Sequence, residues 1–192
     1  MRKRTYLFTL YLTAAAVLFT VIAVSCATYY YPSDPKYTTD QVAQGQALMI
    51  EWRCGYCHTP QIPGPEGTIQ MLSGHPQSDK APNVPDMLMG SPQYMEFLDN
   101  LENTVWATNN VIVFSANLTP DMNTGTGDWT ETMFIDTIRL GRHAGVGKRL
   151  SYPMPWQELA ALSDADLIAI FAYLRTVPPV NNKVPDSIML FR

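Results

Sequence analysis

The feature that most constrains this chain is a five-residue motif, Cys54-Gly55-Tyr56-Cys57-His58. Two cysteines three positions apart bring two thiols to one turn of chain, and an imidazole follows directly. This C-x-x-C-H spacing is typical of covalent haem attachment, in which both thiols bond the porphyrin and the histidine ligates the iron. A redox dithiol or half of a zinc site also uses C-x-x-C. The surrounding sequence offers neither the strand-then-helix setting of the first nor the further ligands of the second. We therefore predict one covalently bound haem c, with Cys54 and Cys57 bonded to it and His58 as the proximal ligand.

The first 26 residues differ in composition from the rest. Arg2, Lys3 and Arg4 form a basic start, and the 21 residues from Thr5 to Ser25 carry no charge, which predicts an export signal or a membrane anchor. The small residue Ser25 before Cys26 has the form of a bacterial lipobox, so we expect lipidation at Cys26. An uncleaved transmembrane helix is the alternative, because 21 residues can span a bilayer with some tilt; simple cleavage is a third.

Either tether places the following chain on the periplasmic side of a membrane in the bacterial cell envelope. The chain has three cysteines, so two for haem and one for lipid leave none over. Residues 27–38 are rich in turn-forming residues and predict a linker. We expect the folded domain to occupy residues 39–180, followed by a C-terminal tail, residues 181–192, that we do not assign.

The charge outside the leader is acidic. Three of the 13 basic residues lie in the leader, which leaves ten against 17 acidic residues. This balance disfavours nucleic-acid binding, which needs a basic face to neutralise phosphates. A cluster of four cations falls within eleven residues, and it indicates a solvated loop, a site for the haem propionates or a docking patch for an acidic partner. Its members are Arg139, Arg142, Lys148 and Arg149.

Three segments have the periodicity and capping residues of helices: residues 39–53, residues 130–140 and a final helix from Ser163 to about residue 177, where two prolines end it. Gly45 interrupts the first and predicts a close crossing with the last, with Tyr173 as the bulky partner. Between the haem motif and the second helix, a short helix at residues 92–103 and a strand at residues 111–114 are expected.

Met154 is the candidate for the distal iron ligand. It stands between Pro153 and Pro155, which hold it in an extended, rigid loop. A thioether opposite an imidazole favours reduced iron and raises the reduction potential, as expected of an electron-transfer haem. Most methionines only fill a core, and other candidate ligands exist. These are Met122, Met133, His143 and His75, the last of which is more typical of a hydrogen-bonded or exposed loop histidine.

The order of helix, C-x-x-C-H, long loop, short helix, methionine loop and final helix resembles the class I cytochrome c family. Residues 117–121, 125–129, 154–156 and 167–179 are similar to the haem modules of the membrane-bound cytochrome subunits of bacterial dehydrogenases. The resemblance implies an all-α class I cytochrome c fold with His/Met haem, here with a long loop insertion before the methionine half. In that group the methionine matching Met154 is the distal ligand. Those subunits carry several haems, whereas this chain has one motif.

A chain with one haem passes electrons singly between two external partners. The sequence therefore predicts a tethered electron carrier rather than an enzyme. Its donor would be a quinol-oxidising complex or a dehydrogenase and its acceptor a terminal oxidase of a respiratory chain. By analogy of architecture it is also similar to lipid-anchored monohaem cytochromes of respiratory complexes. Two alternatives stay open: a fixed haem subunit of a larger membrane oxidoreductase, and a haem enzyme or gas sensor with a labile distal ligand. Beyond the iron ligands, we expect Tyr152, Trp156 and Arg142 to lie near the haem.

Overall fold

The computed structural model of the 192-residue chain describes residues 34–61, 69–79, 103–107 and 111–189. The chain divides into two units, residues 1–32 and 33–192, and every described residue belongs to the second. The predicted leader with Cys26 therefore lies outside the described residues, and so does the predicted helix at residues 92–103 except for its last residue, Asn103, which lies in a turn. Within the described ranges, no helix is both long and apolar enough to cross a membrane.

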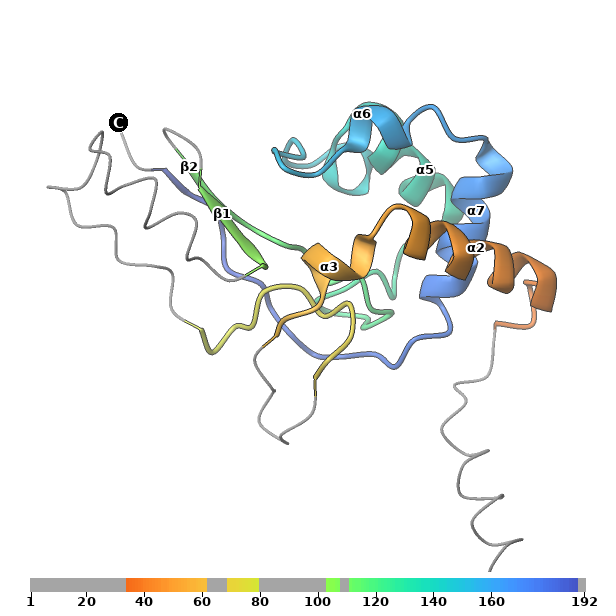
Figure 1. The fold of residues 1–192 in the computed structure, drawn as a ribbon, viewed down its shortest axis with the longest axis horizontal. Helices are drawn as coiled ribbons and strands as arrows, with labels where there is room; N and C mark the ends of the chain where they lie inside the picture. Colours follow the sequence, from red (N-terminus) through yellow and green to blue (C-terminus); the bar gives the residue numbers. More distant parts are fainter. Residues whose placement is uncertain (1–33, 62–68, 80–102, 108–110, 190–192) are drawn as a thin grey trace, which may run out of the picture. The chain divides into compact units, whose positions relative to one another are not determined.

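The fold is built on the crossing of helices α2 (Thr39–Glu51) and α7 (Asp164–Leu174), drawn in orange and blue in Figure 1. A methyl group on Gly45 would lie 1.8 Å from the carbonyl oxygen of Ala169, so the two backbones are in direct contact at this point. The prediction of a close crossing is thus confirmed, but the predicted partner was wrong. The backbone of α7 fills the notch at Gly45, and the ring of Tyr173 packs against the core instead.

The predicted helices form where local caps stop the chain from fraying. Thr38, directly before the predicted helix, begins α2 with a capping box: its hydroxyl accepts from the Gln41 N–H at 3.2 Å, and the Gln41 side chain accepts from the Thr38 N–H at 3.0 Å. Thr130 caps α5 (Glu131–Leu140), which ends at Gly141 with a φ of 60°. Ser163 caps α7 in the same way.

Shorter elements complete the helical part. Helix α3 (Cys54–His58) follows α2, a 3₁₀ turn η2 (His143–Gly145) follows α5, and α6 (Trp156–Leu159) precedes α7. The hydrophobic core lies where α2, α5, α6 and α7 meet, and burying its larger side chains contributes about 1.5–3 kcal/mol each. Its buried members are Tyr37, Met49, Leu72, Phe134, Ile138, Leu159, Leu167, Ile170, Phe171, Ala172, Leu174 and Val177.

The expectation of an all-α fold needs a correction, because the described residues include a small antiparallel sheet. The predicted strand forms as β2 (Val111–Phe114), and it pairs on one side with β1 (Val105–Ala107) and on the other with β3 (Ile188–Met189). Its β-branched residues suit a pleated surface, and Ile112 is buried at 1% exposure. The sheet was missed because its second pairing, Ile112 with Ile188, joins segments far apart in the sequence.

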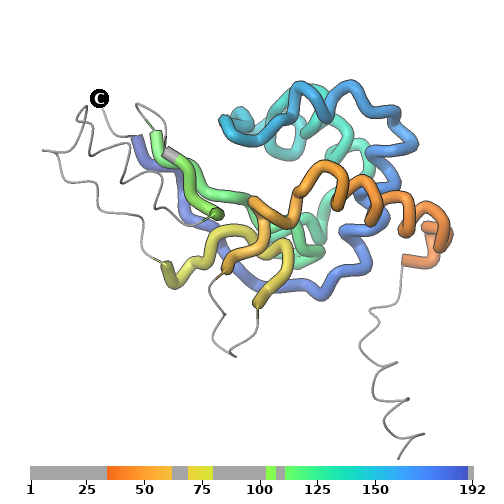
Figure 2. Tube along the Cα trace, viewed as in Figure 1, coloured from red at the N-terminus to blue at the C-terminus, as the bar shows by residue number. Residues whose placement is uncertain are grey.

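The segment that leads into β3 is tied to the rest of the fold by a buried amide. Asn182 donates to the carbonyl oxygens of Ser73 and His75 at 2.7 and 2.8 Å and accepts from the Gln77 N–H at 2.8 Å. Figure 2 follows this last part of the chain, in dark blue, past residues 69–79, in yellow, toward the strands. Part of the segment that we predicted as an unassigned tail therefore packs onto the domain.

Candidate haem site

Helix α3 presents the two thiols of the motif. Arg53, which separates it from α2, has a φ of 53° and a ψ of 34°, a left-handed conformation that turns the chain and starts a new helical turn. Cys54 and Cys57 are free, partly buried cysteines on this turn. Burial raises the pKa of Cys54 to about 11 and also raises that of Cys57. The two sulfur atoms are thus neutral thiols, unpaired with each other, and available for bonding.

The imidazole of His58 is fixed in one orientation. Its Nδ1 lies 2.8 Å from the carbonyl oxygen of Ala116. Because a carbonyl can only accept, Nδ1 carries the proton and Nε2 keeps its lone pair. The ring is buried, which lowers its pKa, while the Ala116 bond opposes this effect. A neutral imidazole with a free Nε2 is the form that ligates a metal.

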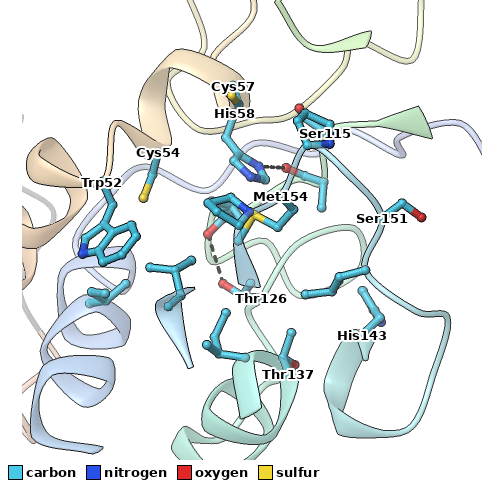
Figure 3. A pocket seen from close by; sticks show the side chains of 18 of the residues that line it. Trp52, Cys54, Cys57, His58, Ser115, Thr126, Thr137, His143, Ser151 and Met154 are labelled. Atoms are coloured by element: carbon cyan, nitrogen blue, oxygen red, sulfur yellow. Dashed lines mark hydrogen bonds between the residues drawn. The ribbon is translucent and has the colours of Figure 1, made fainter. Parts of the chain in front are cut away.

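The site opens onto a cavity of about 240 Å³ between the helices and the sheet. Figure 3 shows Cys54, Cys57, His58 and Met154 among the side chains that line it. Most of its walls are apolar side chains of the core. They come from Met49, Leu118, Phe134, Ile138, Leu159, Leu167, Ile170 and Leu174.

Met154 lies in the same cavity as His58, although 96 positions of sequence separate them. Its N–H donates to the Ser151 carbonyl at 3.1 Å, and both flanking prolines, Pro153 and Pro155, also line the cavity. The loop before α6 therefore supplies the wall that carries the thioether. Whether the sulfur ligates iron stays a prediction at this point.

The donor set suits a covalently attached haem. Two thiols lie on one helical turn, the adjacent imidazole has a free lone pair, and the cavity beside them is apolar. These are the chemical requirements of haem c: two nucleophilic sulfurs for the vinyl groups, one axial nitrogen and a dry pocket for the macrocycle. The residues present therefore fit this cofactor.

The other residues that we predicted near the haem do not line the cavity. Tyr152 is 74% exposed. The ring of Trp156 packs against Gly141, and the guanidinium of Arg142 donates to the Gly147 carbonyl at 3.1 Å. Their roles toward the cofactor stay predictions. They belong to the loop around Met154 but lie outside the cavity wall that this loop forms.

The alternative ligands divide into those inside and outside the cavity. His143 lines it and meets the Trp129 ring edge-on, with centroids 5.0 Å apart. His75 is fully buried, and its Nδ1 lies 3.0 Å from the Thr104 hydroxyl oxygen, so it is hydrogen-bonded as expected of a loop histidine. Neither Met122, which is 63% exposed, nor Met133 lines the cavity.

The sequence did not indicate that the sheet forms one wall of the site. Trp106 of β1, Val113 and Phe114 of β2, and Ser187 just before β3 all line the cavity. The strand at residues 111–114 was recognisable from its β-branched residues. Its position beside the haem motif was not, because that depends on pairing with distant segments.

Comparison with known proteins gives a consistent result. The family described as "Cytochrome c" matches residues 42–178. One component of the nicotinate dehydrogenase of Pseudomonas putida is 34% identical over 79 residues, or 41% of this chain and 7% of that protein. The cytochrome c subunit of gluconate 2-dehydrogenase of Pantoea cypripedii is 38% identical over 76 residues, or 39% of this chain and 17% of that protein. The cytochrome c subunit of the quinone alcohol dehydrogenase of Gluconobacter oxydans is 38% identical over 77 residues, or 38% of this chain and 16% of that protein. The chain thus matches less than a fifth of the length of each relative.

Proposed function

This chain belongs to the cytochrome c family and carries covalent haem c, and from that premise we propose that it is a membrane-tethered monohaem carrier of single electrons with His/Met ligation. The observation that carries the proposal is the meeting of His58 and Met154 on one apolar cavity beside Cys54 and Cys57. A nitrogen and a thioether presented to one pocket leave no open position for a substrate, which suits electron transfer.

Each residue has a distinct task in this proposal. The thiols of Cys54 and Cys57 hold the porphyrin by covalent bonds, so the cofactor stays in place in both redox states. His58 supplies Nε2, oriented by the bond from its Nδ1 to Ala116. Met154 supplies the sulfur from a proline-flanked loop that has little freedom to lose on binding. When bound, the haem supplies a one-electron change between ferric and ferrous iron.

The proposed location is the periplasmic side of a bacterial membrane. The support is the leader: three basic residues, then 21 uncharged residues, then Cys26. If Cys26 is lipidated, the wild-type protein partitions into detergent and a Cys26→Ser variant is released into the soluble fraction. If the wild type and the Cys26→Ser variant both stay in the membrane and both keep an intact N-terminus, the result would favour an uncleaved helix.

The proposed partners follow from the relatives, three of which carry the names of dehydrogenases for nicotinate, gluconate or an alcohol. By this likeness we propose a dehydrogenase as the electron donor; a quinol-oxidising complex as donor and a terminal oxidase as acceptor rest on the proposed carrier role alone. The same names favour a second candidate, a fixed haem subunit of a larger oxidoreductase. Native electrophoresis of detergent extracts with haem staining separates the two: a free carrier runs at the size of the single chain, at most 21.5 kDa of protein, and a fixed subunit runs with its complex.

The test of the ligand set is Met154→Ala in the mature protein. We expect loss of the weak sulfur-to-iron absorption in the far red, while the haem stays attached through the thiols. Met122→Ala is the matched control, since Met122 is largely exposed and outside the cavity, and it should leave the band unchanged. A band that survives in Met154→Ala would exclude this residue as the ligand and point to another thioether. A wild-type protein that lacks the band would instead direct attention to His143, which lines the same cavity.

A haem enzyme or gas sensor would need an exchangeable distal position. Carbon monoxide on the reduced protein and cyanide on the oxidised protein test this directly. The carrier proposal expects neither ligand to change the spectrum within minutes at neutral pH. A rapid change with either ligand would contradict the proposal and support the sensor or enzyme.

A further inference from the structure

The loop between α5 and the Met154 segment folds back on itself as a short antiparallel pair. The Leu150 N–H donates to the Gly141 carbonyl at 2.8 Å, and the His143 N–H donates to the Lys148 carbonyl at 2.9 Å. Between these two bonded pairs, Arg142 lies opposite Arg149 as an isolated bridge. This is the position in an antiparallel ladder where opposed Cα atoms are closest, about 4.5 Å apart, and both side chains leave on the same face.

Two arginines in this arrangement repel each other unless an anion compensates them. Neither guanidinium forms an ion pair within the described part of the chain, whereas the other two cations of this region do. Arg139 pairs with Asp164, and Lys148 pairs with Asp186 at 2.6 Å. The Arg142 guanidinium donates to a neutral carbonyl, that of Gly147. Among the residues that the structure describes, the Arg142–Arg149 pair therefore has no counterion.

This pair lies at the rim of the haem cavity. Arg149 is exposed and lines the cavity, together with the hydroxyl-bearing side chains of Ser151 and Ser187. The ion pair of Lys148 with Asp186 joins the loop to the C-terminal segment next to these residues. The rim thus offers a cation and two hydroxyl groups to an anion whose body lies in the apolar cavity.

Haem c has two anionic groups, its propionates, on the porphyrin edge opposite the carbons that bond the cysteines. A second arginine of the cavity, Arg53, precedes Cys54 and so belongs to the thioether edge. Arg149 comes from a different element and lines the same cavity. We propose that Arg149, with Arg142 beside it, binds a haem propionate. This inference rests on the covalent haem but not on Met154 as its ligand or on any electron partner.

The test is resonance Raman spectroscopy of the mature full-length protein, in which the propionate bending band reports hydrogen bonding to the carboxylate. In Arg149→Gln we expect this band to shift to lower frequency, because the charge-assisted bonds are lost. Arg53→Gln is the matched control, since it removes the same charge from the same cavity, and its band should stay where the wild-type band is. Arg149→Gln and Arg53→Gln each lose one exposed positive charge, so the equilibrium constant for reduction of the haem should fall about two- to fivefold in each. Only the propionate band therefore distinguishes the two variants.

Arg149→Lys keeps the charge but loses the planar fork of donors, so an intermediate shift is expected even if Arg149→Gln does not mature. The proposal would be overturned if the propionate band is unchanged in both Arg149→Gln and Arg149→Lys. It would also be overturned if the band shifts as much in Arg53→Gln as in Arg149→Gln. If the band stays but electron transfer to ferricyanide slows in Arg149→Gln, the proposal is likewise overturned, and the arginine pair serves an external anion instead. A wild-type protein without haem would show no such spectrum at all, so failure of the cofactor is seen separately.

Discussion

The crossing at Gly45 gives the sharpest prediction for stability. In Gly45→Ala the new methyl group would lie 1.8 Å from the Ala169 carbonyl oxygen and 2.5 Å from its carbon, where ordinary contact begins at 3.4 Å. The obstacle is backbone, which cannot rotate away as a side chain can. Helices α2 and α7 must therefore separate by about 1.6 Å at this point, with loss of packing in the core around them.

Two opposing effects set the size of the change. Overpacking of a core costs about 1–3 kcal/mol, and a backbone obstacle places this substitution near the upper value. Alanine is favoured over glycine within a helix by about 1 kcal/mol. The net loss in the free energy of unfolding is then about 2 kcal/mol, which corresponds to a decrease in Tm of about 4–8 °C for a chain of this size.

Thermal unfolding of the mature protein, followed by far-ultraviolet circular dichroism, measures this loss. Gly55→Ala is the matched control, because its methyl group would meet only the Thr59 hydroxyl at an ordinary 3.7 Å. We expect the control to melt at or slightly above the wild-type temperature. A Gly45→Ala protein that is as stable as the wild type would show that the helices do not touch at this residue, and our account of the core would fail.

Two further predictions concern polar contacts. Asn182→Ala should destabilise the fold by more than about 2 kcal/mol in chemical denaturation, because three backbone groups lose their buried partner. Asn181→Ala, at the exposed neighbouring position, is the control. An equal loss of stability in the control would refute the reasoning. The hydroxyl of Thr124 donates to the Asp121 carboxylate and holds the pKa of that carboxyl below its usual value. The ionised carboxylate therefore stabilises the fold at pH values above the ordinary pKa of aspartate. This contribution is lost as the pH falls through the lowered pKa. The Tm gap between wild type and Asp121→Asn should therefore be constant near neutral pH and close below about pH 4; a gap that widens in acid would contradict it.

The helices were predictable because their signals are local. Thr130 and Ser163 cap α5 and α7 through the N–H groups of residues three positions on, so a short window of sequence suffices. The first helix was predicted to begin near Thr39 and Asp40, and the capping box of Thr38 with Gln41 sets its start at Thr39. Gly45 predicted a crossing, but a glycine carries no information about what fills the space it leaves.

The sheet was not predictable in the same way. The strand at residues 111–114 was visible in its β-branched residues. Its two partners were not: β1 at residues 105–107 is a short strand, and β3 at residues 188–189 lies far along the sequence. The bonds of Asn182 to residues 73–77 span more than 100 positions. Contacts at such separation depend on the whole chain being folded, and no local pattern records them.

By itself, the amino-acid sequence determined the chemistry of this protein: a C-x-x-C-H motif can hold a porphyrin only in one way, because bond lengths fix the spacing of two thiols and one imidazole. The tertiary structure decided which other residues line the cavity beside that motif. It brought Met154 and Arg149 to the cavity, and it left Tyr152 and Arg142 outside it. Those positions follow from how α5, the sheet and the methionine loop pack together, and packing is a property of surfaces that meet in space rather than of neighbours in the chain.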